Sequence, residues 1–222
     1  MPNEQKKLTK SEMREDEFVE WILAAADYVR DRAKIFITGA GGLIALVVVI
    51  QLILQAEDEN RNEAFKKLGQ VWIAEDEGRS EDAIRLGEEL ISAYGGTPAA
   101  GRGVIFLANN YYAQERYSEA RNLYQTYLND YGDLDILVFA AWNGLAACFE
   151  AQGNLQKAAE KYREYASLHK TSLQAPQALF EAARCYGLAG NSSSQESLLK
   201  EITTEFSDSP VAAKARQEMK TL

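Results

Sequence analysis

Apolar and polar residues are arranged in two different patterns along the 222-residue chain. Residues 35–54 form an apolar run of 20 residues without a charge, whereas the flanking residues mix charged and apolar positions at helical spacing. Such a run makes a helix of about 30 Å, the thickness of the hydrocarbon core of a bilayer. The pattern therefore predicts a leader at 1–34, a transmembrane helix at 35–54 and a folded domain at 55–222.

The start of the apolar run allows a second interpretation. The stretch "KIFITGAGG" resembles the strand and glycine turn with which extended short-chain dehydrogenases bind a dinucleotide. However, Ala45 replaces the last glycine of that motif, the following helix is apolar on every side, and no second strand with a ribose-binding acid follows. No tyrosine has a lysine four residues later. We therefore expect no dinucleotide cofactor and no enzymatic activity.

The flanks of the apolar run predict an uncleaved anchor and its orientation. The run begins 34 residues into the chain and exceeds the about 7–15 apolar residues of a cleaved signal peptide. Arg30, Arg32 and Lys34 precede it, while the ten residues after Leu54 contain one basic residue, Arg61. This asymmetry predicts a cytoplasmic N-terminus and a domain on the other side of the membrane.

Small residues within the apolar run are spaced for close helix packing. Thr38 lies four residues before Gly42, and Gly41 lies four residues before Ala45. This spacing lets a second helix approach closely, although glycine is also generally common in spanning helices. These four residues are candidates for homo-oligomer formation through the span.

The domain contains an internal repeat with offsets of 37, 38 and 37 residues. Small residues, aromatic residues and turn residues recur in the same columns. The columns contain Ala108, Ala146 and Ala183; then Tyr111, Phe149 and Tyr186; then Glu115, Gly153 and Gly190; and, in the second half, Ala83, Ala120 and Ala158, with Tyr124 and Tyr162 four positions later. Small residues let two helices cross closely and aromatic residues fill the remaining gap, so each unit is a predicted helical hairpin.

These columns resemble the tetratricopeptide repeat family. The matching residues are Trp142, Leu145, Ala146, Phe149, Gly153, Ala158 and Tyr162. The match is weakest after Asn191, where the expected alanine is missing. The resemblance implies an all-α protein in which the span precedes an α-solenoid of about four hairpins. A C-terminal capping helix would follow, with Ser209 as its cap and Pro210 as its first residue.

Two further resemblances concern the repeats and the order of the chain's segments. The longer period and the closing "EFSDSPVAAKAR" are similar to repeats of bacterial outer-membrane assembly lipoproteins. The order of leader, span and repeat domain is similar to the ancillary subunit of the Sec translocon. The second resemblance implies a protein of the inner (cytoplasmic) membrane, with its repeats in the periplasm and with envelope, secretion or chaperone components as partners.

In such solenoids the first helices of successive hairpins line a groove that binds a peptide or a helix. The equivalent columns assign eight candidate contact residues of mixed polarity. They are Trp72, Arg102, Asn109, Tyr112, Asn143, Glu150, Gln177 and Arg184. The ladder of lysine and asparagine residues that clamps a terminal carboxylate in some family members is missing, so that ligand class is not expected.

Composition limits the remaining function classes. Residues 55–222 contain 17 basic and 25 acidic residues, a balance that disfavours nucleic acid as a partner. His169 is the single histidine, and Cys148 and Cys185 lack metal-site spacing. We expect no catalytic site and no metal site. The two cysteines fall in one column of adjacent hairpins, which is too wide a separation for a disulfide, and are predicted to be buried free thiols.

The leader predicts an amphipathic helix. Thr9 and Glu12 have the spacing of a capping box, and Phe18, Ile22, Ala25 and Val29 form an apolar stripe. Many acidic residues disfavour anionic lipid, so a protein is the expected contact.

Together these patterns predict a membrane-anchored, non-enzymatic scaffold for protein–protein interactions in the bacterial envelope. The alternative is a structural oligomer assembled through the leader and the span.

Overall fold

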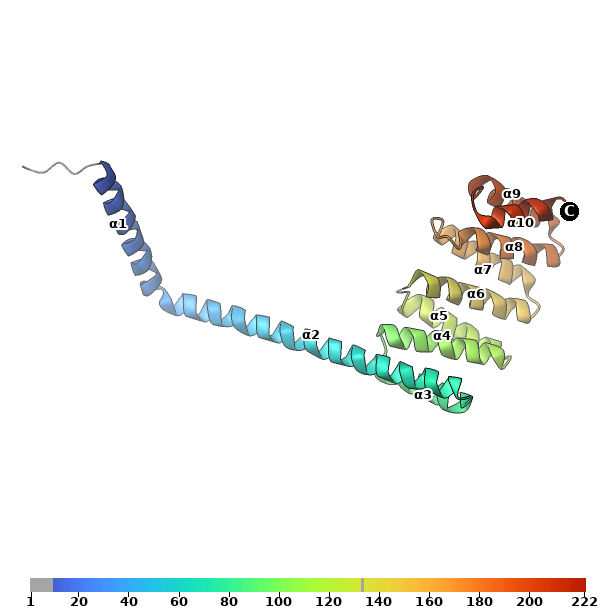
Figure 1. The fold of residues 1–222 in the computed structure, drawn as a ribbon, viewed down its shortest axis with the longest axis horizontal. Coiled ribbons are helices and arrows are strands. Elements are labelled where there is room, and N and C mark those ends of the chain that lie inside the picture. The colour runs from blue at the N-terminus through green and yellow to red at the C-terminus, as the bar shows by residue number, and fades with distance from the viewer. Residues whose placement is uncertain (1–9, 133) are drawn as a thin grey trace, which may run out of the picture. The chain divides into compact units, whose positions relative to one another are not determined.

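The computed structural model describes residues 10–132 and 134–222, and within these residues every regular element is a helix (Figure 1). The chain divides into two compact units, Met1–Asp58 and Glu59–Leu222. The helices are α1 (Lys10–Asp31), α2 (Ala33–Asp76), α3 (Ser80–Tyr94), α4 (Pro98–Ala113), α5 (Tyr117–Asp130), α6 (Asp135–Ala151), α7 (Leu155–Leu168), α8 (Ala175–Leu188), α9 (Ser192–Glu205) and α10 (Pro210–Met219).

The first unit contains α1 and the beginning of α2. Residues 35–39 are helical, so the strand required by the dinucleotide interpretation does not form. Among the described helices, α2 alone is long and apolar enough to cross a membrane, and none of its apolar window is buried. Its length and composition fit a membrane span or a signal sequence. The leader helix is present as α1, while the predicted cap at Thr9 lies outside the described residues.

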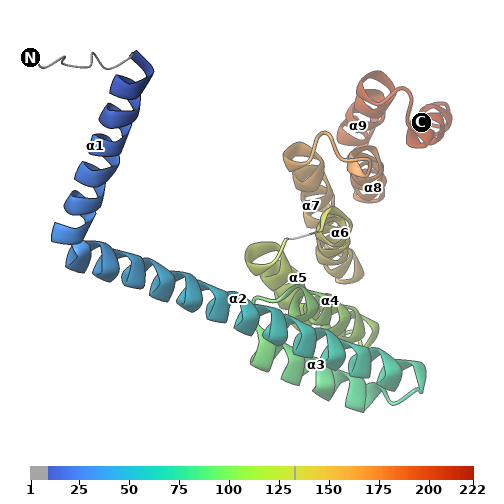
Figure 2. The ribbon, with the colours of Figure 1, turned by 60° about the vertical axis from the view of Figure 1, so that its left-hand side comes forward.

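The second unit is a tetratricopeptide-like solenoid, as predicted. The hairpins α2–α3, α4–α5, α6–α7 and α8–α9 stack in sequence, and α10 packs on α8 and α9 (Figure 2). The first helices form one row, in which α4 packs directly against α6 and α8 against α10. In the described part of the chain no comparable packing joins α5 to α7, α7 to α9 or α6 to α8, but an ion pair between Arg184 and Glu150 joins α6 to α8. The row of first helices is therefore the inner face of the solenoid.

The repeat columns form the core. Ala108, Ala146 and Ala183 are buried on the first helices, and the predicted alanine columns of α3, α5 and α7 are completely buried. Tyr124 and Tyr162 are also buried and fill the space between neighbouring hairpins. The prediction that small residues permit close crossing and aromatic residues fill the gaps is confirmed.

Tight turns between the two helices of each hairpin occur at the predicted column. Gly153 and Gly190 adopt φ values of 74° and 76°, and Gly78 adopts 73°. Glu115 occupies the same position with φ of 61°. This left-handed conformation favours glycine, so Glu115 is held there by the surrounding hairpin.

The two ends of the solenoid are closed in different ways. At the C-terminus the Ser209 hydroxyl accepts a hydrogen bond from the Val211 amide at 3.2 Å, and Pro210 is the first helical residue, as predicted. At the other end, the described residues before α2 form no hairpin. Its outward face carries Glu63, Lys66 and Gln70, which are exposed. The equivalent face of α4 is apolar, and its Leu107 packs against α3. The polar face of α2 therefore ends the stack in solvent.

The hairpins give the solenoid two edges. The first edge carries the loops that follow α3, α5, α7 and α9 and lead to the next first helix; we call it the joining edge. The second edge carries the tight turns that follow α2, α4, α6 and α8; we call it the turn edge. The helices α4, α6 and α8, and the part of α2 from Glu59 onward, therefore begin at the joining edge and end at the turn edge (Figure 1).

Candidate functional site

The inner face of the solenoid presents side chains from α2, α4, α6 and α8. All eight predicted contact residues lie on these four helices, and each is exposed or partly exposed. The structure joins some of them in one hydrogen-bonded network and places the others in separate groups.

An ion network occupies the α6 and α8 end of the inner face. The Arg184 guanidinium donates two hydrogen bonds of 2.8 Å to the two carboxylate oxygens of Glu150, and a third of 2.8 Å to Glu181. Gln177 donates to the other Glu181 oxygen at 2.7 Å. These hydrogen bonds from Arg184 hold the pKa of Glu150 below its usual value. One guanidinium and two carboxylates therefore leave a formal excess of one negative charge at this end.

Polar and aromatic groups occupy the middle of the inner face. The buried Tyr124 hydroxyl donates to Asn109 Oδ1 at 2.7 Å, so Asn109 is partly engaged by its own hairpin. Tyr112 packs edge-on against Tyr117, with 5.4 Å between ring centroids. Asn143 is exposed on α6. The exposed Asn143 amide is thus accessible to a partner.

The α2 end of the inner face is apolar. Trp72 is 53% exposed, and Phe65, seven residues earlier on the same helix, is 42% exposed. The Arg102 guanidinium carbon lies 5.5 Å from the Phe65 ring centroid. The repeat offset places Phe65 in the same column as Arg102 and Gln177, so the period could have identified it. The same offset aligns Glu181 with Gly144. The residues at this repeat position do not share a charge, so the sequence alone did not predict the ion network.

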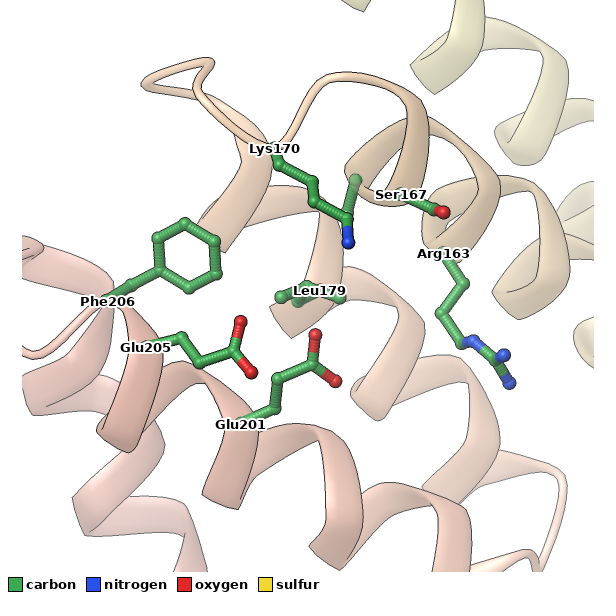
Figure 3. Close-up of a pocket in the computed structure, with 8 residues that line it drawn as sticks. Arg163, Ser167, Lys170, Leu179, Glu201, Glu205 and Phe206 are labelled. Carbon is green, nitrogen blue, oxygen red and sulfur yellow. The ribbon is translucent and has the colours of Figure 1, made fainter.

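A cavity on the outer side was not predicted. It lies between α7, α8 and α9 and has a volume of about 410 Å³ (Figure 3). Arg163 and Lys170 come from α7 and the residues just after it, while Glu201 and Glu205 come from α9. Burial and the neighbouring Glu205 raise the pKa of Glu201. None of these four side chains forms an ion pair with another described residue.

The two cysteines are buried free thiols, as predicted. Burial raises the pKa of Cys148 to about 11 and the pKa of Cys185 to about 12. The Cys185 thiol donates to Glu150 at 3.5 Å and therefore borders the ion network. Both groups stay protonated at neutral pH and are poor nucleophiles and poor metal ligands.

Comparisons with known proteins support the tetratricopeptide repeat family. Residues 107–172 match the family model described as Tetratricopeptide repeat. No curated protein matches the sequence. Tetratricopeptide repeat proteins are typically non-enzymatic scaffolds that bind other proteins or peptides.

Two solved structures show the likeness of fold. One is a crystal structure of kinesin light chain repeats from Podosopora anserina, described as nearly identical TPR-like repeats. Its sequence is 17% identical to this chain, the TM-score is 0.52, and the match covers 66% of this chain and 76% of that chain. BtubC (BKLC) from P. vanneervenii is 14% identical, with a TM-score of 0.54, and the match covers 72% of this chain and 65% of that chain. At these identities the similarity concerns the fold alone.

Proposed function

We propose that this chain is a membrane-anchored scaffold that binds other proteins through the inner face of its repeat solenoid. Residues 1–34 form a cytoplasmic leader, residues 35–54 cross the inner membrane of a bacterium, and residues 55–222 present the repeats on the periplasmic side. The partners belong to secretion, chaperone or envelope-assembly complexes. The observation that carries the proposal is the open inner face, with exposed aromatic residues on α2 and exposed polar residues on α4 and α6.

The distribution of charge on the inner face favours one kind of ligand. At the α8 end Arg184 is already engaged by Glu150 and Glu181, so an anionic ligand would have to compete with bonds of 2.8 Å. At the α2 end Trp72 and Phe65 offer apolar surface. A peptide or helix that places apolar side chains on α2 and makes neutral hydrogen bonds to Asn143 fits both conditions.

Site-specific photo-crosslinking tests this proposal in living cells. A photoreactive amino acid in place of Asn143 should capture a discrete protein, and one in place of Trp72 should capture the same protein. The matched control is Gln156, which is exposed on α7, outside the row of first helices. Equal capture from Gln156, or no capture from either inner position, would contradict binding at the inner face.

A structural oligomer is the second candidate function. Among the described residues, no side chain lies within 4 Å of a Cβ placed on Gly41 or Gly42, so this surface of the span is open to a second helix. Replacing both glycines by leucine should abolish assembly and leave partner capture intact if the span holds copies of the chain together. Unchanged assembly would remove this candidate.

A further inference from the structure

The joining edge of the solenoid carries exposed aliphatic side chains. Leu173, in the loop between α7 and α8, is 91% exposed, and Leu168 at the end of α7 is 64% exposed. Ile136 and Leu134, at the start of α6, are 59% and 37% exposed. A hollow of about 570 Å³ lies beside Leu173 and is bordered by Pro176, Phe206 and Pro210. Leu134 and Leu173 thus lie in connecting segments, where polar residues are usual, and Ile136 and Leu168 lie on the helix ends beside them.

The tight turns of the turn edge have the opposite character. Its four turns, at 77–79, 114–116, 152–154 and 189–191, contain glycine, alanine, charged and amide residues and no large apolar residue. Exposed apolar residues also lie at the helix ends of this edge: Leu188 is 62% exposed, and Trp72 and Ile73 near the end of α2 are 53% and 57% exposed. The two edges therefore differ in their connecting segments, which contain large apolar residues at the joining edge alone.

The chain enters the repeat unit at the apolar edge. The repeat unit begins at Glu59, and the part of α2 that belongs to it starts, like α4, α6 and α8, at the joining edge. The apolar run ends at Leu54, five residues earlier. Five residues span at most about 18 Å even when fully extended. The α2 end of the joining edge is therefore tethered close to the point where the proposed span leaves the bilayer.

We propose that the joining edge rests on the lipid interface, with Leu168 and Leu173 inserted among the headgroups. This inference depends on the proposed membrane anchor. The interfacial layer on each side of the hydrocarbon core is about 5–8 Å thick, and the α2 end of the joining edge is held near it. Aliphatic side chains that enter this layer lose contact with water, which favours the contact.

Charges on the joining edge indicate which lipids suit it. Asp130, Asp135 and Asp208 lie in or beside its loops, and Lys170 is the one basic residue in the loop between α7 and α8. This surplus of acidic groups gives no attraction to anionic headgroups. The contact is apolar, so it forms on zwitterionic phosphatidylcholine and does not deepen when anionic lipid is added.

Nitroxide depth measurements on the full chain in phosphatidylcholine nanodiscs test this contact. A spin label on Leu173→Cys should relax faster with lipid-soluble oxygen and slower with an aqueous nickel complex than a label on Leu188→Cys, the matched control at the turn edge. The parent chain, whose Cys148 and Cys185 are fully buried, provides the background signal.

A third label, on Val47→Cys within the apolar run, separates the two levels of the proposal. If the Val47 label resides in lipid and the Leu173 label is as accessible to nickel as the Leu188 label, the joining edge does not contact the membrane and this inference is overturned. If the Val47 label is itself aqueous, the anchor fails and the inference fails with it. Lipid contact at Val47 and Leu173, but not at Leu188, is the expected result.

Discussion

Gly144 tests the packing between hairpins most sharply, because the structure leaves no room for a side chain there. A Cβ on Gly144 would lie 2.5 Å from Cε1 and Cε2 of the Tyr124 ring, and still closer to its Cζ. Tyr124 is 3% exposed, and its hydroxyl is fixed by Asn109 at 2.7 Å. The ring of one hairpin therefore rests directly on the backbone of the next, and Gly144→Ala must displace it.

The expected cost follows from three opposing contributions. Alanine is favoured over glycine within a helix by about 1 kcal/mol, which would stabilise the variant. Overpacking a core site costs about 1–3 kcal/mol, and this site lies at or above the upper end because three ring atoms are involved. Displacing the ring also loses the Tyr124 to Asn109 hydrogen bond, which contributes about 1 kcal/mol. The balance is a destabilisation of about 3 kcal/mol or more.

Urea unfolding of the full chain in detergent, followed by circular dichroism, measures this cost. Gly69→Ala is the matched control, because Gly69 lies in the α2 helix with nothing within 4 Å of its Cβ position, and it should be stabilised by about 1 kcal/mol. Tyr124→Leu makes space, so Gly144→Ala in that background should cost much less than in the parent. A stabilising Gly144→Ala substitution, or equal costs in both backgrounds, would refute the proposed ring position.

Three further predictions concern single features. Glu115→Gly should raise the free energy of unfolding by about 1 kcal/mol, because φ of 61° strains a residue with a side chain; a lower unfolding midpoint in urea would contradict this. Hydrogen bonds from Arg184 lower the pKa of Glu150 from 4.5, so their stabilisation is present above that pH and is lost on further acidification. The free energy of unfolding of the Arg184→Gln variant should therefore fall less than that of the parent when the pH is lowered from neutral to below 4.5. An equal fall in both proteins would exclude a stabilising contribution from the Arg184–Glu150 hydrogen bonds. Cys148 and Cys185 should resist iodoacetamide in the folded chain at about pH 8 and react after denaturation, which intact mass detects; labelling before denaturation would show that they are exposed.

The repeat period was sufficient to predict the helical hairpins and most of their core. The alanine and tyrosine columns recur because the helices of each hairpin cross at the same short distance. The alignment of Ala146 with Ala183 therefore already implies that both are buried. Turn positions follow for the same reason, since Gly153 and Gly190 need the same left-handed backbone. Local sequence therefore determines this part of the fold.

The last hairpin shows why one unit matched the repeat pattern poorly. Gln195 stands in the column that contains Ala120 and Ala158, yet it is 8% exposed. A Cβ on Gly187 would lie 2.6 Å from the Gln195 side chain, so the small residue has moved to the facing helix. The Gln195 amide also donates to Glu218 on α10 at 3.3 Å. A single-column comparison cannot detect such an exchange because it involves two helices.

The candidate site was predictable only in part. Columns identify the helices of the inner face, but they do not show that Glu150 and Arg184, 34 residues apart, bond to each other. That pairing depends on the distance between neighbouring hairpins. The apolar joining edge also lies outside the columns, since Leu173 belongs to a loop whose length differs from that of the other loops. Contact by the eight predicted residues remains a prediction.

Protease accessibility of a C-terminal tag on intact spheroplasts tests the central claim, a repeat domain held on the outer side of the membrane by the residue 35–54 span. Cleavage of the tag in intact spheroplasts is the predicted result, because the basic residues at Arg30, Arg32 and Lys34 favour a cytoplasmic N-terminus. Protection of the tag until the membrane is broken would contradict it, and the partners would then have to be sought among cytoplasmic proteins.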